Sequence, residues 1–443
     1  MIFDETRPVV HRDELPKEID VVVIGGGVAG ICTAFYLAKA GVSVVVCEKG
    51  RVAGEQSSRN WGWVRQQFRD PGEVPLAIEA NRLWEEICLE LDEDIGFART
   101  GVLYATSDPE QLEEAEQWME VAQQHQIDTR MLTGGEVDEL MKGPPNVQVG
   151  GIYTPSDGKA EPFKAVPAIA RACQKNGVLI RENCAVRNLV TEGGQVRGVV
   201  TEHGEIRSQS VVCAGGAWSS RFFGNLGVWL PQLSVKGTVV RTAAAPNVFD
   251  GACVAGHLGI RRRQDGGYTI ATATTHEHYV GRDSFRSLPK YLPAILQGSM
   301  EIQVSFAEGL FNRMTQPAHW RDDEVSPFEE TRILNPNPSH KAMKRIKQGL
   351  EKHMPVLAEV PIAQAWAGMI DAMPDVVPVM DAVPGFHDFY VATGFSGHGF
   401  GIGPSTGKTM SDMVLGNPLA HDLSRFRFSR FSDGSKMVPG PGI

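Results

Sequence analysis

Short, uninterrupted apolar runs alternate along the chain with longer stretches in which apolar residues recur at helical spacing. Runs rich in Val and Ile are typical of strands buried on both faces. Such runs occur at residues 20–25, 42–47, 210–213 and 389–393. The amphipathic spacing predicts helices over residues 31–40, 109–126, 162–177 and 341–353. The alternation of the two patterns favours an α/β fold class.

The first strand leads directly into Gly25-x-Gly27-x-x-Gly30, and the helix and strand that follow end at Glu48. This is the complete βαβ fingerprint of a dinucleotide site, in which glycines allow a tight turn and a pyrophosphate lies against the helix N-terminus. The Glu48 carboxylate can accept both ribose hydroxyls and disfavours a 2′-phosphate. The fingerprint therefore predicts FAD or NAD, bound by Gly25, Gly27, Val28, Ala29, Gly30 and Glu48.

Glycine-rich or small-residue segments follow three of the predicted strands, at 49–62, 214–219 and 394–401. Backbone that approaches a ligand at several distant points suits a long, extended cofactor, which favours FAD over NAD. There is no second GxGxxG unit for NADPH, so the electrons should come from the substrate. The further candidate cofactor residues are Lys49, Gly54, Gln56, Ser57, Ser58, Arg59, Asn60, Trp61, Gly62, Ala214, Gly215, Gly216, Trp218, Gly394, Gly397, His398, Gly399, Phe400 and Gly401.

Composition narrows the class of protein. The chain has 43 Lys and Arg against 53 Asp and Glu, a net charge of −10, which argues against a general nucleic-acid binder. The one apolar stretch of membrane-like length, residues 21–38, is interrupted by glycines, so no transmembrane segment is predicted. The seven cysteines include no CxxC pair, which favours buried reduced thiols, no metal site and a cytoplasmic location.

Together these segments resemble the D-amino-acid oxidase superfamily of FAD-dependent amine and amino-acid oxidoreductases. The resemblance rests on GGGVAG with Glu48, on VVCAGGAWS, and on WAGMIDAMPDVVPVMD followed by ATGFSGHGFGIGPSTG. A closer resemblance, to bacterial L-amino-acid deaminases and L-amino-acid oxidases, rests on Glu48-Lys-Gly-x-x-Ala-Gly-Glu-Gln-Ser-Ser-Arg59 and Glu324-Val-Ser-Pro-Phe-Glu-x-x-Arg332.

The resemblance implies an α/β (α+β overall) architecture, with a Rossmann-like FAD-binding domain and a strand-rich substrate domain. The FAD-binding domain would be discontinuous, formed by residues 1–95, 150–226 and 355–421. The substrate domain would comprise residues 96–149 and 227–354, with a tail at 422–443. Val186 would meet the adenine through its backbone. Gly368 stands where covalently flavinylated sarcosine oxidases carry Cys, which implies non-covalent FAD.

The implied reaction is oxidation of an amino acid, with L-amino acids favoured, by hydride transfer from Cα to flavin N5. The imine would hydrolyse to a 2-oxo acid and ammonia, and oxygen would reoxidise the flavin to give hydrogen peroxide. A secondary-amine dehydrogenase of the sarcosine or opine type, passing electrons to a quinone or protein, is the alternative. A non-catalytic flavoprotein is a third hypothesis. The sequence leaves monomer and homo-oligomer open.

Reduced flavin is anionic near N1 and O2, and a helix predicted to begin near Ser405 and Thr406 could aim its N-terminus there. A substrate carboxylate calls for an Arg, with Arg65 favoured and Arg313, Arg332 and the run 261–263 as alternatives. The deaminases' carboxylate-binding Arg aligns near Ala273, where this chain has none.

Several further side chains are assigned by position. Trp63 and Gln67 are predicted to line the substrate pocket beside Arg65. Trp366 either lines that pocket or packs in the core. The ring of His398 either only packs against its neighbours or carries a positive charge that assists the reaction with oxygen or stabilises negative charge. Lys236 and two members of the 261–263 run are predicted to be solvated. The candidate catalytic residues are therefore Arg65, Trp366 and His398.

Overall fold

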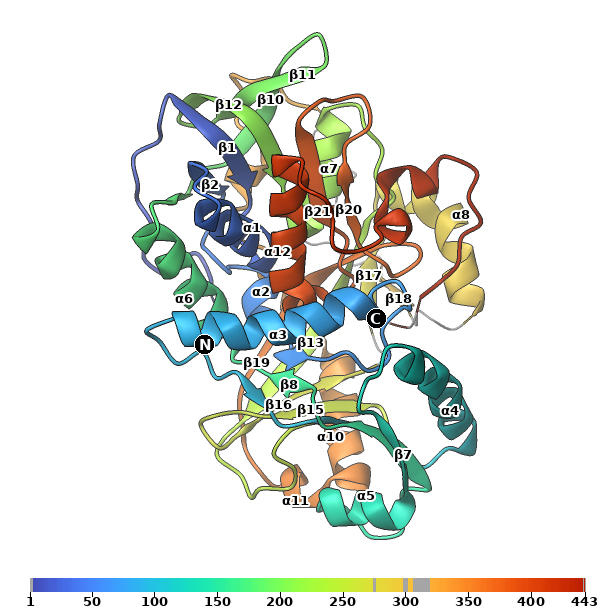
Figure 1. Cartoon of the computed structure of the whole chain (residues 1–443). Coiled ribbons are helices and arrows are strands. Elements are labelled where there is room, and N and C mark those ends of the chain that lie inside the picture. The colour runs from blue at the N-terminus through green and yellow to red at the C-terminus, as the bar shows by residue number, and fades with distance from the viewer. Residues whose placement is uncertain (1–2, 274–275, 298–301, 306–318, 441, 443) are drawn as a thin grey trace.

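Two large sheets, stacked one above the other in Figure 1, organise the chain in this computed structural model. The structure describes residues 3–273, 276–297, 302–305, 319–440 and 442. The upper sheet has the order β10-β11-β12-β1-β2-β9, with β21 on β12 and β20 on β21. Its strands are β1 (Glu18–Ile24), β2 (Val44–Glu48), β9 (Leu179–Glu182), β10 (Val186–Glu192), β11 (Gln195–Thr201), β12 (Gly204–Cys213), β20 (Val379–Ala382) and β21 (Phe389–Thr393).

The centre of the upper sheet is parallel. Ile24 of β1 pairs with Cys47 of β2 on one side and Cys213 of β12 on the other, and β21 pairs in parallel with β12. The predicted strands at 20–25, 42–47, 210–213 and 389–393 are confirmed. Because parallel strands end at the same sheet edge, Gly25, Glu48 and the glycines after Cys213 and Thr393 are brought to one edge.

Helices α1 (Val28–Lys39), α6 (Pro162–Lys175) and α12 (Gly399–Leu415) pack on the upper sheet, and α3 (Val74–Glu90) packs against α12. Glycines let α12 lie directly on α1. A Cβ at Gly403 would come within 2.4 Å of Val28, and one at Gly407 within 2.4 Å of the Cys32 carbonyl carbon. Trp84 of α3 donates its indole N–H to Gly401 O at 2.9 Å.

The start of α12 corrects the sequence-based expectation. The helix begins at Gly399, so Ser405 and Thr406 lie buried in its interior and do not cap it. Low helix propensity made the glycines and Pro404 look like a loop. Close packing against α1 requires those glycines, and tertiary contact overrides the local preference.

The lower sheet has the order β18-β17-β13-β16-β15-β14-β5-β7-β6, with β19 also paired to β13. Its strands are β5 (Val102–Thr106), β6 (Arg130–Thr133), β7 (Gly150–Thr154), β13 (Leu233–Thr242), β14 (Ala252–Ala255), β15 (Leu258–Arg262), β16 (Tyr268–Thr272), β17 (His276–Tyr279), β18 (Ile302–Ser305) and β19 (Ile362–Ala372). A small sheet joins β3 (Trp63–Val64), β8 (Gly158–Lys159) and β4 (Ala98–Arg99). Strand β3 of this small sheet follows the segment after Glu48, and it pairs with β8, which lies about 95 residues further along the chain.

The other helical elements are mostly short or lie on the lower sheet (Figure 1). They are α2 (Gln56–Arg59), α4 (Pro109–Gln124), α5 (Gly134–Leu140), α7 (Ser219–Asn225), α8 (Arg282–Leu296), α9 (Pro327–Glu330), α10 (His340–His353), α11 (Pro355–Ala358) and the 3₁₀ turns η1 (Gly216–Trp218), η2 (Ser424–Phe426) and η3 (Phe428–Phe431). The helices predicted over 109–126, 162–177 and 341–353 are confirmed to within two residues at each end.

The discontinuous domain division stays a prediction. All strands of the upper sheet come from segments assigned to the FAD-binding domain. β7 and β19, which the boundaries at 150 and 355 also give to that domain, pair in the lower sheet. β19 reaches the cleft described next, so the lower sheet contributes directly to the site.

Candidate cofactor and substrate site

A cleft with about 1180 Å³ of empty space lies at the edge where β1, β2 and β12 end. Most of the predicted cofactor residues line it: Gly25, Gly27, Val28, Ala29, Glu48, Lys49, Gly54, Gln56, Ser57, Asn60, Val186, Ala214, Gly215, Gly216, Trp218, Gly397, Gly399 and Phe400. The others are adjacent in sequence but outside the lining: Gly30, Ser58, Arg59, Trp61, Gly62, Gly394, His398 and Gly401. The cleft therefore collects all the glycine-rich segments that the sequence singled out.

The glycine turn fits a pyrophosphate. Gly25 has a φ of +108°, and a Cβ there would come within 2.5 Å of Ala214 O. A Cβ at Gly30 would come within 2.1 Å of Gly25 O. Helix α1 starts beside this turn without a side-chain cap or an acidic residue in its first turn. Val28 N–H donates to Ser57 Oγ at 2.9 Å, and the helix dipole favours an anion in the cleft beside it.

Glu48 is fixed by two backbone amides. Gly26 N–H donates to one carboxylate oxygen and Gly50 N–H to the other, each at 2.6 Å. Burial raises the pKa of Glu48, and Lys49 and the two amide bonds oppose that effect. The carboxylate is thereby held at the end of β2, where its remaining lone pairs can accept ribose hydroxyls.

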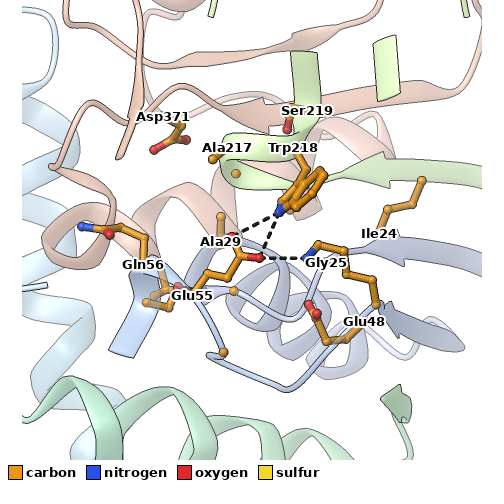
Figure 2. A pocket seen from close by; sticks show the side chains of 18 of the residues that line it. Ile24, Gly25, Ala29, Glu48, Glu55, Gln56, Ala217, Trp218, Ser219 and Asp371 are labelled. Atoms are coloured by element: carbon orange, nitrogen blue, oxygen red, sulfur yellow. Dashed lines mark hydrogen bonds and ion pairs between the residues drawn. The ribbon is translucent and has the colours of Figure 1, made fainter. Parts of the chain in front are cut away.

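Glu55 is a cleft residue that the sequence analysis missed. Its carboxylate accepts the Trp218 indole N–H at 2.9 Å, the Lys49 ammonium at 2.8 Å and the Leu334 amide at 3.1 Å. Figure 2 shows Glu55 reaching toward Trp218. No periodic pattern marks this residue, because its partners come from chain segments far apart. It joins the segments after β2, β12 and α9 around the cleft.

Asp371 of β19 was also missed, and it marks the opposite end of the cleft from Glu48 (Figure 2). Its carboxylate accepts the amides of Gly394 at 2.8 Å and Phe395 at 3.1 Å. Burial raises its pKa to about 6. The N-terminus of α12, at Gly399 and Phe400, lines the same region. This end of the cleft thus has a helix N-terminus suited to an anionic ring edge.

The predicted substrate residues Trp63, Arg65 and Gln67 lie outside the cleft lining, next to α12. Nη1 of Arg65 donates to the carbonyl oxygens of Gln67 and Phe68. The guanidinium lies 5.6 Å from the Tyr104 ring centroid. The Trp63 indole N–H and both amide atoms of Gln67 are buried without partners among the described residues. Such groups carry a desolvation cost that a ligand can relieve.

Arg69, Glu73 and His398 form a buried ionisable cluster beside these residues. The Glu73 carboxylate accepts a hydrogen bond from Nδ1–H of the His398 ring at 3.1 Å. Burial and then Arg69 lower the pKa of His398, outweighing Glu73, so the ring is neutral at neutral pH. Burial also lowers the pKa of Arg69 to about 9. Nε2 of His398, and Nε and Nη1 of Arg69, lack partners within the described part of the chain.

The structure also shows where three other predicted site residues lie. Arg332 makes an ion pair with Glu202 and donates to Lys49 O, so it is neither in the cleft nor paired with Glu329 or Glu330. Trp366 is buried in the core and donates its indole N–H to Arg59 O at 3.0 Å. Val186 lines the cleft as expected for an adenine contact. Arg313 lies outside the residues that the structure describes.

Two predictions of solvated cations are wrong. Lys236 is 6% exposed and pairs with Glu277 at 2.7 Å, because β13 is covered on both sides. Arg261 and Arg263 are 1% and 6% exposed, since the hairpin that carries them faces the cofactor half of the molecule. In the turn that follows them, Gly267 N–H donates to the Asp265 carboxylate and Arg263 N–H donates to Gly267 O.

Within the described residues, no helix is long and apolar enough to cross a membrane. All seven cysteines are free, and six of them are buried.

The fold and cleft define a flavin-dependent oxidoreductase of the dinucleotide-binding α/β class. Residues 20–413 match the family model for FAD dependent oxidoreductases, and the chain belongs to that family. The protein is an FAD-dependent enzyme, as the sequence predicted.

Solved and curated relatives show where the chain lies within this family. The L-amino acid deaminase of Proteus myxofaciens, solved with anthranilate, is 31% identical over 97% of each chain, with a TM-score of 0.92. Mitochondrial dimethylglycine dehydrogenase of Mus musculus is 25% identical over 94% of this chain, which spans 45% of that relative's length. Sarcosine oxidase subunit beta of an Arthrobacter species is 26% identical over 95% of this chain and 93% of the relative.

Proposed function

We propose that this enzyme oxidatively deaminates amino acids, with the L-enantiomers as substrates. The observation that carries this proposal is the likeness to the Proteus myxofaciens L-amino acid deaminase over nearly the whole of both chains. The proposed products are a 2-oxo acid and ammonia, with oxygen accepting the electrons as hydrogen peroxide. The proposed reaction consumes one amino acid, one water and one oxygen molecule.

When bound, FAD supplies the acceptor for the hydride that leaves Cα. The glycine turn at Gly25 and the α1 N-terminus would hold the pyrophosphate, and Glu48 the ribose. Non-covalent binding is supported at Gly368, because a glycine has no thiol that could form a covalent bond to the flavin. The N-terminus of α12 would stabilise negative charge on the ring edge near Asp371.

We place the amino-acid head group among the unpartnered polar atoms of Trp63, Gln67, Arg69 and His398. Arg65 and Arg69 interact electrostatically, and together they would hold the substrate carboxylate. The neutral His398 ring can accept at Nε2, which suits a hydrogen bond from a neutral amine. The proposed division of roles needs no other acid or base.

A secondary-amine dehydrogenase is the second candidate. It is supported by the likeness to dimethylglycine dehydrogenase and sarcosine oxidase subunit beta, whose names specify N-methylated glycines. Substrate binding would use the same carboxylate contacts, and the difference would lie in the space around the nitrogen.

The test uses the purified yellow protein with each L- and D-amino acid and with sarcosine and dimethylglycine. Flavin bleaching is followed without oxygen, and peroxide is measured in air. We expect bleaching and peroxide with L-amino acids. Bleaching by N-methylglycines alone would replace this proposal with the second one, and bleaching without peroxide would replace oxygen with another acceptor.

A matched pair of variants tests the carboxylate assignment. R65M and R69M should each raise KM for the amino acid by about tenfold to a hundredfold, as loss of a charged hydrogen bond implies. Arg99, a surface residue paired with Glu85 at 2.9 Å, provides the control variant R99M. Unchanged KM in R65M and R69M would refute the assignment while leaving the reaction intact.

A further inference from the structure

A second cavity lies beside the cofactor cleft and shares Asn60 with it. Its empty space of about 370 Å³ includes open solvent, and the enclosed part has room for about one water-sized group. Four arginines line it, Arg59, Arg241, Arg261 and Arg263, and we call it the arginine pocket. They come from α2, β13 and the β15–β16 hairpin, so the fold collects them from three parts of the chain.

Three of the four arginines are buried and Arg241 is partly exposed, and all four guanidinium groups are incompletely satisfied. Arg59 and Arg261 are each 1% exposed, and Arg263 is 6% exposed. Nη1 of Arg261 and Nε of the other three arginines are buried without hydrogen-bond partners among the residues the structure describes. Buried polar groups are almost always hydrogen-bonded, and an unpaired charged donor is costly. Four unused donors on one cavity therefore point to a missing acceptor.

Only two of the four arginines form ion pairs with protein carboxylates, although Glu55 and Asp4 act electrostatically on Arg59, and Asp265 acts on Arg241. Arg261 pairs with buried Glu161 at 3.0 Å, and Arg263 pairs with Asp265, which is largely exposed. Arg59 donates to the neutral oxygens of Asn335, Ala367, Phe3 and Gly54. The side chain of Arg241 makes no hydrogen bond within the described part of the chain. Four guanidinium groups therefore line the pocket, and only those of Arg261 and Arg263 form ion pairs with a carboxylate.

Other neighbours add to the positive potential. Helix α6 begins at Pro162 on the wall of the pocket, with no side-chain cap and no acidic residue in its first turn. Its dipole therefore favours negative charge there. Burial and then Arg261 lower the pKa of nearby Lys159 to about 8, which is the direction expected of a site already rich in cations.

We propose that the arginine pocket binds an oxyanion, the carboxylate or phosphate group of a small ligand. Planar guanidiniums bind both groups through paired hydrogen bonds, which would satisfy the unused donors. The oxyanion has two sources: a free anion, or the acidic side chain of a substrate that extends past Asn60 from the cleft. The proposal concerns a site separate from the amino-acid head group and does not rest on the proposed function.

The test measures binding of inorganic phosphate and of succinate to the FAD-loaded enzyme by calorimetry at low ionic strength. R241Q removes a guanidinium that has no hydrogen bond to lose. R262Q is the matched control, because Arg262 is the next residue after Arg261 and instead donates to Ala245 O and Pro246 O. Thermal melts of both variants establish that they fold, and R241K keeps the charge without the planar fork.

We expect R241Q to weaken binding of phosphate or succinate about tenfold or more and R241K to weaken it less, with R262Q unchanged. Wild-type dissociation constants weaker than about 1 mM for both anions would overturn the proposal. Equal affinity in wild type and R241Q would also overturn it, since the anion would then bind elsewhere.

Turnover separates the two sources. Initial rates are measured with L-glutamate and L-leucine in wild type and R241Q. A rise in KM confined to L-glutamate would show that the pocket receives a substrate side chain. Weaker phosphate binding with both KM values unchanged would show that it receives a free anion. The calorimetric arm needs no turnover, so its outcome is independent of whether amino acids are the substrates.

Discussion

Nδ1 of His398 lies 3.1 Å from the Glu73 carboxylate, although 325 residues separate the two in sequence. His398 precedes α12 and Glu73 precedes α3, so the contact joins the starts of two helices that pack against each other. Both side chains are almost fully buried, at 3% and 0% exposure. The pair couples the flavin end of the cleft to the segment that carries Arg65 and Arg69.

Burial of His398, against the opposing effect of Glu73, gives the enzyme an acid-sensitive component of stability. Burial lowers the pKa of His398 below its ordinary value of 6.5, so the unfolded chain takes up a proton there before the folded one does. Stability from this group is complete above pH 6.5 and is lost as the pH falls below it. Between about pH 7 and pH 5, the free energy of unfolding of wild type should therefore fall more than that of H398Q. Parallel curves in denaturant titrations would contradict this.

Asp371 should act with the opposite sign. Its folded pKa is raised to about 6 from 3.8, so the folded state keeps a proton that the unfolded state releases. Stability is therefore lost as the pH rises from about 4 to about 6, by up to about 3 kcal/mol for a fully buried carboxyl. D371N should lack this loss and be more stable than wild type at neutral pH. A stability difference between the two that does not vary with pH would refute the assignment.

The Arg261–Glu161 pair should behave as a buried ion pair. Each side chain is 2% exposed, and R261M leaves the Glu161 carboxylate without its guanidinium partner. We expect R261M to lower the free energy of unfolding by about 3–5 kcal/mol. The double variant R261M/E161M should recover much of that loss, because neither charge then remains buried alone. Additive losses in urea titrations would show that the two residues act independently.

Close packing of α12 on α1 should make Gly407 intolerant of a side chain. The Cβ of G407A would meet the Cys32 backbone, which cannot move aside, so we expect a loss of about 1–3 kcal/mol or more. Gly224 in α7 provides the control, because a Cβ there meets nothing within 4 Å. G224A should be neutral or stabilising by up to about 1 kcal/mol. Similar melting temperatures for the two variants would contradict the packing argument.

Glu48 should govern FAD affinity, because two backbone amides hold its carboxylate where it can accept the ribose hydroxyls. E48Q keeps one acceptor oxygen but loses the charge that strengthens hydrogen bonds to the ribose, so FAD should bind about tenfold to a hundredfold more weakly. Fluorescence release of FAD on dilution measures this, and a melt of the FAD-free variant reports folding. Unchanged FAD affinity would remove Glu48 from the ribose contact.

The sequence predicted the cofactor half of the fold well because its signals are local. Gly25, Gly27 and Gly30 lie within six residues of one another, and the strand and helix beside them carry strong apolar periodicity. The same locality explains Glu48, which directly follows a buried strand. The strand before Gly394 was also predicted to the residue.

Residues that act through distant partners were beyond sequence reasoning. Nothing in the sequence near Glu55 or Asp371 marks them as site residues. Their roles depend on hydrogen bonds from the Trp218 indole and the Gly394 amide, which lie far away in the sequence. Lys236 was misplaced for the same reason, since only the pairing of β13 with β19 shows that it is buried. Tertiary contact, which no local pattern encodes, decides all three.

The last strand of the parallel set, β21, joins β12 only after almost the whole chain is available. The cleft lining runs from Ile24 to Phe400, so on a ribosome the N-terminal fingerprint emerges long before its ring-binding end exists. We therefore expect nucleotide capture to be completed late in synthesis, once α12 can pack on α1. A nascent chain halted before residue 389 would carry the phosphate turn and still be colourless.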